Sequence, residues 1–355
     1  MDRSEKTRSM LTKHFQDYPE MQIQDLFKYI FHSSFGCEHL ISSLEKATDY
    51  IQKEYDGLTE SGVKLTEPLD GEYSRVHLSY LDQGLSVETL GKIFFLSAKK
   101  ETDGLANLEE KLDVARSLSR EGILPFSPVE LDDAINKWRS LGYPAIHHSD
   151  IFRAKYTPAY RVISNHFAKF LPLFAKIDRA LQGGSVAVAI DGGSASGKTT
   201  LGEILLSVYD CNIIHMDDFF LRPHQRTPER LSEVGGNIDR ERFLEEILIP
   251  HSQNLPISYR KFDCSTMSLS SPIDVPQKRL TIIEGAYSMH PALAEYYNLS
   301  VFLDISPEFQ RQRIKKRNSP QMAERFFGEW IPLEQIYFEK TDIRARSDLS
   351  ISINE

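Results

Sequence analysis

The chain has few cysteines and no recognisable export or membrane segment. Its 355 residues include only three cysteines, Cys37, Cys211 and Cys264, which lie far apart. A sparse, odd count without a Cys-x-x-Cys or Cys/His cluster excludes a disulfide framework and predicts reduced thiols. Residues 1–20 are charged rather than apolar, and no run approaches the roughly 18 apolar residues of a spanning helix. We therefore expect a cytoplasmic protein that does not bind membranes.

An excess of positive charge is also missing. Lysine and arginine number 42 against 51 aspartates and glutamates, which gives a net charge of −9. This balance argues against a sequence-independent grip on nucleic acid, so no nucleic-acid partner is expected. Internal repeats and low-complexity tracts are absent as well. With 41% hydrophobic residues, the composition is that of an ordinary globular protein with a packed core.

The first part of the chain predicts an all-helical N-terminal domain over residues 1–142. Ile23, Leu26, Phe27, Ile30 and Phe31 recur at helical spacing and form one apolar stripe. Further helices are predicted near residues 40–51, 87–100, 105–120 and 127–141, and residues 56–73 read as a loop rich in Gly, Pro and Asp. Residues 143–182 are interpreted as a connector.

From residue 183 the pattern becomes that of an α/β domain, which we place at residues 183–355. Short apolar runs alternate with helical patterns, and the runs cover residues 186–190, 211–216, 280–285, 300–305 and 349–353. Runs this short and this rich in Val and Ile are typical of strands buried on both faces. Their alternation with helices predicts a parallel sheet with flanking helices.

The first of these runs leads into the stretch "GGSASGKTT". It satisfies the phosphate-loop pattern G-x-x-x-x-G-K-[ST], in which glycines let backbone N–H groups turn toward phosphate oxygens. Lys198 can reach the β- and γ-phosphates, Thr199 can ligate Mg²⁺, and the following helix adds its positive N-terminal end. The predicted ATP-binding residues are Gly192, Gly193, Ser194, Ala195, Ser196, Gly197, Lys198, Thr199 and Thr200.

The motif that reads guanine in GTPases, N-K-x-D, does not follow the loop. A kinase or a less typical ATPase is therefore favoured. The run at residues 211–216 ends in "HMDDFF", which places Asp217 and Asp218 at the carboxyl end of a strand, where open sheets bind ligands. A carboxylate there can orient and deprotonate an acceptor hydroxyl, or hold Mg²⁺ through water. A helix N-cap would explain one of the two aspartates.

The stretches "GGSASGKTT", "HMDDFF" and "TIIEGA" come in the order and spacing of the uridine kinase-like P-loop kinases, and residues 186–355 resemble that group. The group includes uridine, nicotinamide riboside and pantothenate kinases and phosphoribulokinase. The resemblance implies ATP and Mg²⁺ as cofactors and a small-molecule acceptor with a hydroxyl group. A nucleoside or riboside is the first expectation.

The resemblance also assigns residues on the acceptor side. By position, Asp217 matches the catalytic base and Glu284 the acidic residue near Mg²⁺. Asp239 stands where family members bind sugar hydroxyls, although it equally fits a helix N-cap. The segment "ISYRKFDCSTM" resembles the substrate cover and offers Tyr259, Phe262 and Asp263. It lacks the histidine expected after the aromatic residue, so recognition of uracil or cytosine is not implied.

A basic segment near residues 311–317 resembles the lid of the same family. Arg313 and Arg317 are spaced i, i+4 on one helix face, and such arginines can neutralise charge on a transferring phosphoryl group. A solvated basic helix is the alternative for each of them. Together with Lys198 and Asp217, these two arginines complete the predicted catalytic set.

The N-terminal half of the chain resembles no family, but it contains polar residues whose side chains could bind ligands or take part in catalysis. They are His32, Glu38, His39, Arg75, His77, His147, His148 and Arg153. They would suit a second active site or a regulator pocket, yet lone histidines are commonly structural and the spacing matches no metal motif. The domain could regulate a kinase, mediate homodimerisation, or help recognise the acceptor.

The sequence leaves two other interpretations of the chain open. One is an ATP-binding regulatory switch whose helical domain engages a partner. The other is an enzymatic N-terminal domain fused to the kinase.

Overall fold

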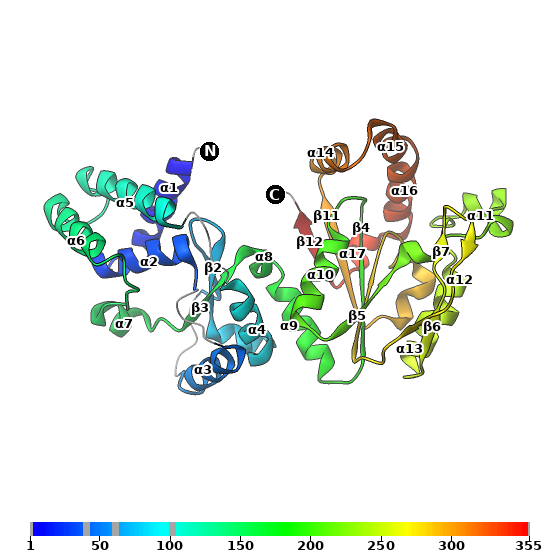
Figure 1. Ribbon diagram of the computed structural model, residues 1–355, viewed down its shortest axis with the longest axis horizontal. Coiled ribbons are helices and arrows are strands. Elements are labelled where there is room, and N and C mark those ends of the chain that lie inside the picture. The colour runs from blue at the N-terminus through cyan, green and yellow to red at the C-terminus, as the bar shows by residue number, and fades with distance from the viewer. Residues whose placement is uncertain (1–2, 38–42, 59–63, 99–103, 354–355) are drawn as a thin grey trace. The chain divides into compact units, whose positions relative to one another are not determined.

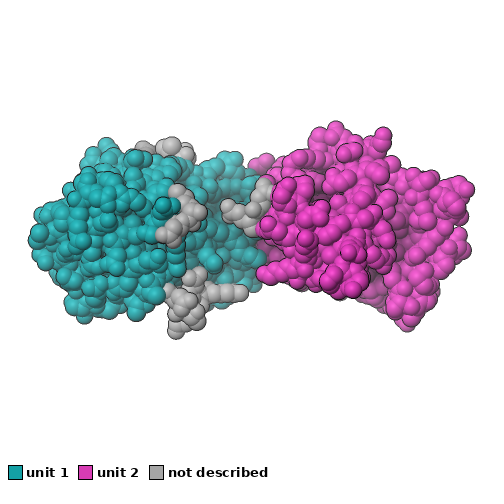
Figure 2. Space-filling view, turned by 90° about the horizontal axis from the view of Figure 1, so that it is seen from above, with its two compact units in different colours: residues 1–175 teal, residues 176–355 magenta. Residues whose placement is uncertain are grey.

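The computed structural model describes residues 3–37, 43–58, 64–98 and 104–353. The chain forms two compact units, Met1–Ala175 and Lys176–Glu355 (Figure 2). Along the sequence, the boundary between the two units falls within residues 143–182, which the sequence analysis treats as a connector. Within the described ranges, no helix combines the length and the apolar character needed to cross a membrane.

The N-terminal unit is mainly helical, as predicted (Figure 1). Serine residues cap the N-termini of several of its helices. Ser43, Ser86 and Ser149 each accept a hydrogen bond from the backbone N–H three residues later, a donor that has no partner within the helix. The helices are α1 (Arg3–Asp17), α2 (Ile23–Phe35), α3 (Leu44–Asp56), α4 (Val87–Ser97), α5 (Gly104–Arg120), α6 (Pro128–Ser140), α7 (Asp150–Tyr156), α8 (Asn165–Ala168) and, crossing the boundary, α9 (Leu171–Leu181).

The same unit also contains a three-stranded antiparallel sheet, so the prediction of an all-α domain needs correction. Strands β1 (Thr66–Pro68), β2 (Tyr73–His77) and β3 (Tyr160–Ser164) are ordered β1-β2-β3. Strand β1 lies in the predicted loop and β3 in the predicted connector. The strands are short, β3 lies more than 80 residues from β2, and Arg75 occupies a buried position of β2. These features hide the alternation that marks a strand in the sequence.

The C-terminal unit is built on a five-stranded parallel sheet in the order β12-β11-β4-β10-β5. Its strands are β4 (Val186–Gly192), β5 (Cys211–His215), β10 (Leu280–Glu284), β11 (Leu299–Ile305) and β12 (Leu349–Ile353). All five predicted strands are confirmed. Every residue of β4 and β10 is buried, as expected for strands covered on both faces.

Helices cover the parallel sheet, and two short antiparallel strand pairs form separate small sheets in the same unit (Figure 1). The apolar core joins residues of the sheet, such as Ile214 and Ile283, to Phe243 and Tyr337 from the covering helices. The helices are α10 (Lys198–Val208), α11 (Pro228–Ser232), α12 (Arg240–Phe243), α13 (Ile249–Ser252), α14 (Pro307–Arg317), α15 (Pro320–Arg325), α16 (Ile331–Thr341) and α17 (Ile343–Arg346). The strand pairs are β6 (Ile257–Tyr259) with β9 (Ile273–Val275), and β7 (Phe262–Asp263) with β8 (Ser268–Leu269).

Strand β4 is the point at which the strand order changes direction. From β4 the chain moves to β5 and back to β10 on one side, and then crosses to β11 and β12 on the other. Connections leave β4 and its neighbours toward opposite sides, which opens a crevice at the carboxyl ends of these strands. The phosphate-loop sequence follows β4 and therefore lies at this crevice.

Candidate active site

The phosphate loop joins strand β4 to helix α10 in a conformation that requires glycine at both ends. Gly192 has φ +145°, and a Cβ there would lie 2.4 Å from the carbonyl oxygen of Leu303. Gly197 has φ +98° and precedes the first residue of α10. L side chains rarely adopt these backbone angles. The motif thus folds as a tight turn that ends on a helix N-terminus, which is an anion-binding arrangement.

Lys198 begins helix α10 and folds over the loop. Its Nζ donates hydrogen bonds to the carbonyl oxygens of Gly192, at 2.8 Å, and Gly193, at 3.1 Å. A lysine at this point places a positive charge beside the inward-facing N–H groups of the loop, where phosphate oxygens would bind.

Helix α14 holds the loop from one side. Gln310 Nε2 donates to the Ser194 carbonyl at 2.9 Å, and Arg313 Nη1 donates to the Ala195 carbonyl at 3.1 Å. The Arg313 guanidinium also lies 4.4 Å from the centroid of the Phe309 ring. One turn later, exposed Arg317 lies over Phe326 at 5.9 Å. Of the two predicted lid arginines, Arg313 is the one that the structure brings to the phosphate loop.

Helix α16 holds the loop from another direction through a carboxylate. Glu334 Oε2 accepts a hydrogen bond from the Ser194 N–H at 2.9 Å, and Oε1 accepts one from the Ser194 hydroxyl at 2.6 Å. Glu334 is only 4% exposed. Burial raises the pKa of its carboxyl, while the charge of Lys198 and the bonds from Ser194 oppose the shift. The carboxylate of Glu334 therefore uses the N–H and hydroxyl donors of Ser194, in a loop whose remaining N–H groups are suited to binding phosphate.

A second buried carboxylate links the same helix to the base of the loop. Asp191 Oδ1 accepts from the Gly192 N–H at 2.7 Å, and Oδ2 accepts from the Tyr337 hydroxyl at 2.8 Å and the Met289 N–H at 3.0 Å. Burial raises the pKa of Asp191, and these donors oppose the rise. Tyr337 follows Glu334 by three residues, so one face of α16 contacts both the end of β4 and Ser194 in the loop.

The two predicted metal-binding residues, Thr199 in the first turn of α10 and Glu284 at the end of β10, contact each other. The Thr199 hydroxyl donates to Glu284 Oε1 at 3.2 Å, and His215 Nδ1 lies 2.5 Å from the same oxygen. The hydrogen bond from His215 to Glu284 is the main cause that raises the histidine's pKa. Hydroxyl and carboxylate oxygens are the donors that Mg²⁺ prefers. In the described residues no group of three or more His, Cys, Asp or Glu side chains is arranged to hold a metal ion.

Asp217 follows strand β5 at the same edge of the sheet. Its side chain remains accessible to solvent, yet partial desolvation by the surrounding protein raises the pKa of the carboxyl. Lys198 opposes this shift and Glu284 adds to it, so these two residues lie near Asp217. An accessible carboxylate beside the phosphate-binding lysine is suitably placed to accept a proton from a bound hydroxyl.

Asp218, the second aspartate of the pair, faces the hairpin segment. Its Oδ2 accepts from the Tyr259 hydroxyl at 3.0 Å and lies 3.1 Å from Lys261 Nζ. The Tyr259 ring stacks on Phe219, with centroids 5.4 Å apart. Strand β6 is thereby fixed against the segment after β5.

Asp239 is 1% exposed and caps helix α12 by accepting from the Arg242 N–H at 3.3 Å. Its Oδ2 also accepts from Gln225 Nε2 at 3.0 Å and lies 3.6 Å from Arg222 Nη2. The helix-cap interpretation of Asp239 is thus realised, and the carboxylate is already paired.

The other two residues of the predicted substrate segment differ from each other. Phe262 is buried, with the Arg226 guanidinium 5.6 Å from its ring centroid. Asp263 is exposed and accepts from the N–H and hydroxyl of Ser265 within its own turn. Its observed role is local.

The sequence analysis missed Asp191, Glu334, Tyr337 and Gln310. A carboxylate at the end of an otherwise apolar run was a usable signal for Asp191. The contacts of Glu334 and Gln310 join residues 140 and 116 positions apart, and no local pattern reports such contacts.

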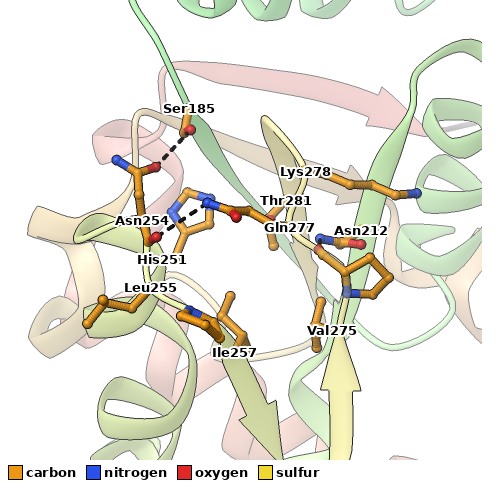
Figure 3. Close-up of a pocket in the computed structure, with 12 residues that line it drawn as sticks. Ser185, Asn212, His251, Asn254, Leu255, Ile257, Val275, Gln277, Lys278 and Thr281 are labelled. Atoms are coloured by element: carbon orange, nitrogen blue, oxygen red, sulfur yellow. Dashed lines mark hydrogen bonds between the residues drawn. The ribbon is translucent and has the colours of Figure 1, made fainter.

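The opposite, amino-terminal edge of the sheet carries a hollow of about 330 Å³, counting the open space at its mouth (Figure 3). Ser185, Asn212 and Lys278 stand at the starts of three strands around it, and the Ser185 hydroxyl donates to Asn254 Oδ1. Ligands of open parallel sheets bind at the carboxyl edge. We therefore place the candidate active site at the phosphate loop and not in this hollow.

No protein-family model matches the chain, and no curated protein is similar to it. Among solved structures it resembles one described as a possible uridine kinase from Bacillus stearothermophilus, at 18% identity and TM-score 0.37, covering 50% of this chain and 98% of that one. It also resembles one described provisionally as a fructose transport system kinase from Silicibacter sp. TM1040, at 20% identity and TM-score 0.40, covering 49% and 95%. A shikimate kinase from Bacteroides thetaiotaomicron matches at 17% identity and TM-score 0.25, covering 47% and 86%. Resemblances this distant do not identify a substrate.

Proposed function

We propose that the chain is an ATP-dependent phosphotransferase that transfers the γ-phosphate to a hydroxyl of a small molecule, as in the uridine kinase-like group. The observation that carries the proposal is the meeting of two features at one sheet edge. A phosphate loop ends on Lys198, and the accessible carboxylate of Asp217 lies within its electrostatic reach. A protein that only binds ATP needs no such acceptor-side base.

Each group then has a separate task. The loop N–H groups and Lys198 hold the β- and γ-phosphates, and Arg313 closes over them from α14. Asp217 orients the acceptor hydroxyl and accepts its proton. Thr199 and Glu284 would hold Mg²⁺, which when bound neutralises charge on the phosphates. Positioning and electrostatics supply most of the rate.

A nucleoside or riboside is the acceptor we expect first. Two features support this expectation: the order of the motifs in the sequence, and the side chains of Asp218 and Tyr259, which are hydrogen-bonded to each other next to the proposed catalytic base Asp217. Asp239 is already paired with Gln225, so an acceptor that uses its carboxylate must displace that amide.

The decisive experiment is a screen of nucleosides, ribosides, pantothenate and sugar acids for stimulated ADP release from Mg-ATP by the full chain. At least one acceptor should stimulate release and appear as its phosphate ester by mass spectrometry. ATP consumption that no acceptor stimulates, combined with nucleotide-dependent binding of a partner protein, would instead favour a regulatory switch.

A further inference from the structure

A buried polar face of helix α2 distinguishes the N-terminal unit. Asp25, Lys28, Tyr29 and His32 recur at i, i+3, i+4 and i+7 and therefore share one side of the helix. Asp25, Tyr29 and His32 are at most 2% exposed, and Lys28 is half-buried. Burying polar groups costs free energy unless they are paired or bind a ligand. This face is either a closed network or one wall of a binding site.

One end of the face is a closed network. Asp25 Oδ1 lies 2.8 Å from His148 Nδ1, and His148 Nε2 lies 2.6 Å from the Tyr160 hydroxyl. Burial lowers the pKa of His148 to about 4, against the effect of Asp25. The neutral ring therefore donates from Nδ1 to Asp25 and accepts at Nε2 from Tyr160. Both nitrogens are used.

The other end, at Arg75, is not closed. Arg75 on β2 is 3% exposed, and its Nη1 donates to Glu67 Oε2 at 3.2 Å. Its guanidinium lies 4.6 Å from the ring centroid of Tyr160 and 5.5 Å from that of Tyr29. Within the part of the chain that the structure describes, Nε and Nη2 have no hydrogen-bond partner. A guanidinium keeps its charge, and a buried donor without a hydrogen-bond partner is destabilising.

Two further cations, Lys28 and Arg153, lie near this arginine. Burial, followed by the charges of Arg75 and Arg153, lowers the pKa of Lys28 to about 8. Lys28 Nζ donates to the Ile146 carbonyl at 3.0 Å, and exposed Arg153 donates to the His148 carbonyl from Nε at 3.0 Å. These two side chains form a partly exposed basic rim beside the cluster. Three cations thus face the carboxylates of Asp25 and Glu67.

We propose that this cluster binds a small molecule through an oxyanion, either a carboxylate or a phosphate group, with Arg75 as the anion-binding residue. The Nε and Nη2 atoms form one edge of the planar guanidinium, which is the geometry that grips two oxygens of one anion. Lys28 and Arg153 attract the anion at the rim, and the rings of Tyr29 and Tyr160 bound the site. The inference does not depend on the proposed kinase activity.

The site unites residues that the sequence analysis could only list. His32, Arg75 and His148 contact Tyr160, and Arg153 donates to the His148 carbonyl. His77 instead accepts from the Ser79 N–H at the start of the next turn, and the His147 carbonyl accepts from Gln24. Glu38 and His39 lie outside the described residues.

The test uses the full chain labelled with ¹⁵N-arginine, because phosphate also suits the phosphate loop and a residue-specific signal is needed. The side-chain Nε–H resonance that is lost in Arg75→Lys identifies Arg75. Inorganic phosphate and acetate are then titrated separately to about 10 mM, ten times a weak dissociation constant of about 1 mM. A saturable shift with phosphate alone indicates a phosphate-bearing ligand, and one with acetate alone indicates a carboxylate. Either result, or a shift with both, supports the proposal.

Two further variants guard against misfolding and nonspecific charge effects. Lys28→Gln keeps a donor for the Ile146 carbonyl but removes a charge, so it should weaken binding about tenfold. Lys46→Gln makes the same change at an exposed position of α3 and should leave binding unchanged. If the Arg75 resonance shifts with neither anion, or equally in Lys28→Gln and wild type, the proposal is wrong and buried water satisfies Arg75.

Discussion

The charged groups around the phosphate loop are mostly carboxylates, whereas those around Arg75 in the other unit combine cations with carboxylates. Near the loop, Asp191, Asp217, Glu284 and Glu334 outnumber the positive charges of Lys198 and Arg313. Around Arg75, Lys28 and Arg153 add positive charge to an arginine with two unpaired nitrogens. An acidic site with backbone donors suits a phosphate that arrives with a divalent cation. A basic site suits an anion that arrives alone. The two units therefore call for different experiments.

The largest effect is expected from Asp217→Asn, which tests whether one carboxylate at the loop is a base. The amide cannot accept the acceptor's proton, so kcat should fall about 10³-fold, within the usual range for general-base catalysis. ATP affinity, measured by calorimetry, should not fall, because Asp217 binds no phosphate and the amide removes a negative charge near Lys198.

Asp263→Asn is the matched control for that variant. It makes the same chemical change in an exposed local turn and should retain nearly full activity. If Asp263→Asn lost activity while Asp217→Asn kept it, the assignment of the base would be reversed.

The second effect is a difference in acid stability between the two units. His148 has a pKa of about 4 in the folded state against an ordinary 6.5. The unfolded chain therefore takes up a proton first as pH falls, and stability that is complete above pH 6.5 declines down to about pH 4. The loss from this residue is about 3 kcal/mol. In the other unit the raised pKa of His215 has the opposite sign: its stabilisation is present below pH 6.5 and declines as pH rises through the folded value.

Amide hydrogen exchange of the full chain measures both trends separately, in α2 and β2 and in β4 and β10. His148→Gln should reduce the acid-dependent loss in α2 and β2, leaving the contribution of buried His14, whose pKa burial also lowers. If protection in α2 stayed constant from pH 7 to pH 4 in the wild type, the neutral, buried state of His148 would be wrong.

A smaller effect is expected at Glu334. Glu334→Gln keeps an oxygen that can accept from Ser194 but removes a negative charge near the phosphates. ATP affinity should rise about 5- to 30-fold, since a charge about 10 Å away is worth roughly 1–2 kcal/mol at an effective dielectric constant of about 20. Calorimetric titration with Mg-ATP measures this, with Glu329→Gln on an exposed segment as the control. Weaker binding in Glu334→Gln would mean that the carboxylate supports the loop and does not compete with phosphate.

The smallest difference separates the two lid arginines. Arg313→Ala removes the contact with the Ala195 carbonyl and should lower kcat/KM for ATP at least tenfold. Arg317→Ala removes an exposed cation–π contact worth about 0.5–1 kcal/mol, and its effect on kcat/KM should stay below about threefold. Equal losses in both variants would place Arg317 on the phosphates as well.

How much could be read from the sequence depends on the range of each interaction. The five strands and the phosphate loop were predictable because hydrophobic runs and "GGSASGKTT" are local patterns. The sheet of the N-terminal unit was not, since Arg75 on β2 pairs with Val162 on β3, more than 80 positions away in the chain. The role of Glu334 was equally invisible, because a glutamate on a helix reads as a solvated residue until the fold brings it to Ser194.

The two links between α16 and the phosphate loop constrain how this protein can diverge. Asp191 with Tyr337, and Ser194 with Glu334, are buried or partly buried pairs in which losing one member removes a side-chain hydrogen bond from the other. In related sequences, position 337 should therefore lose its hydroxyl only where 191 loses its carboxylate, and positions 194 and 334 should change together. A phosphate-loop motif would then be inherited jointly with a helix some 140 residues downstream.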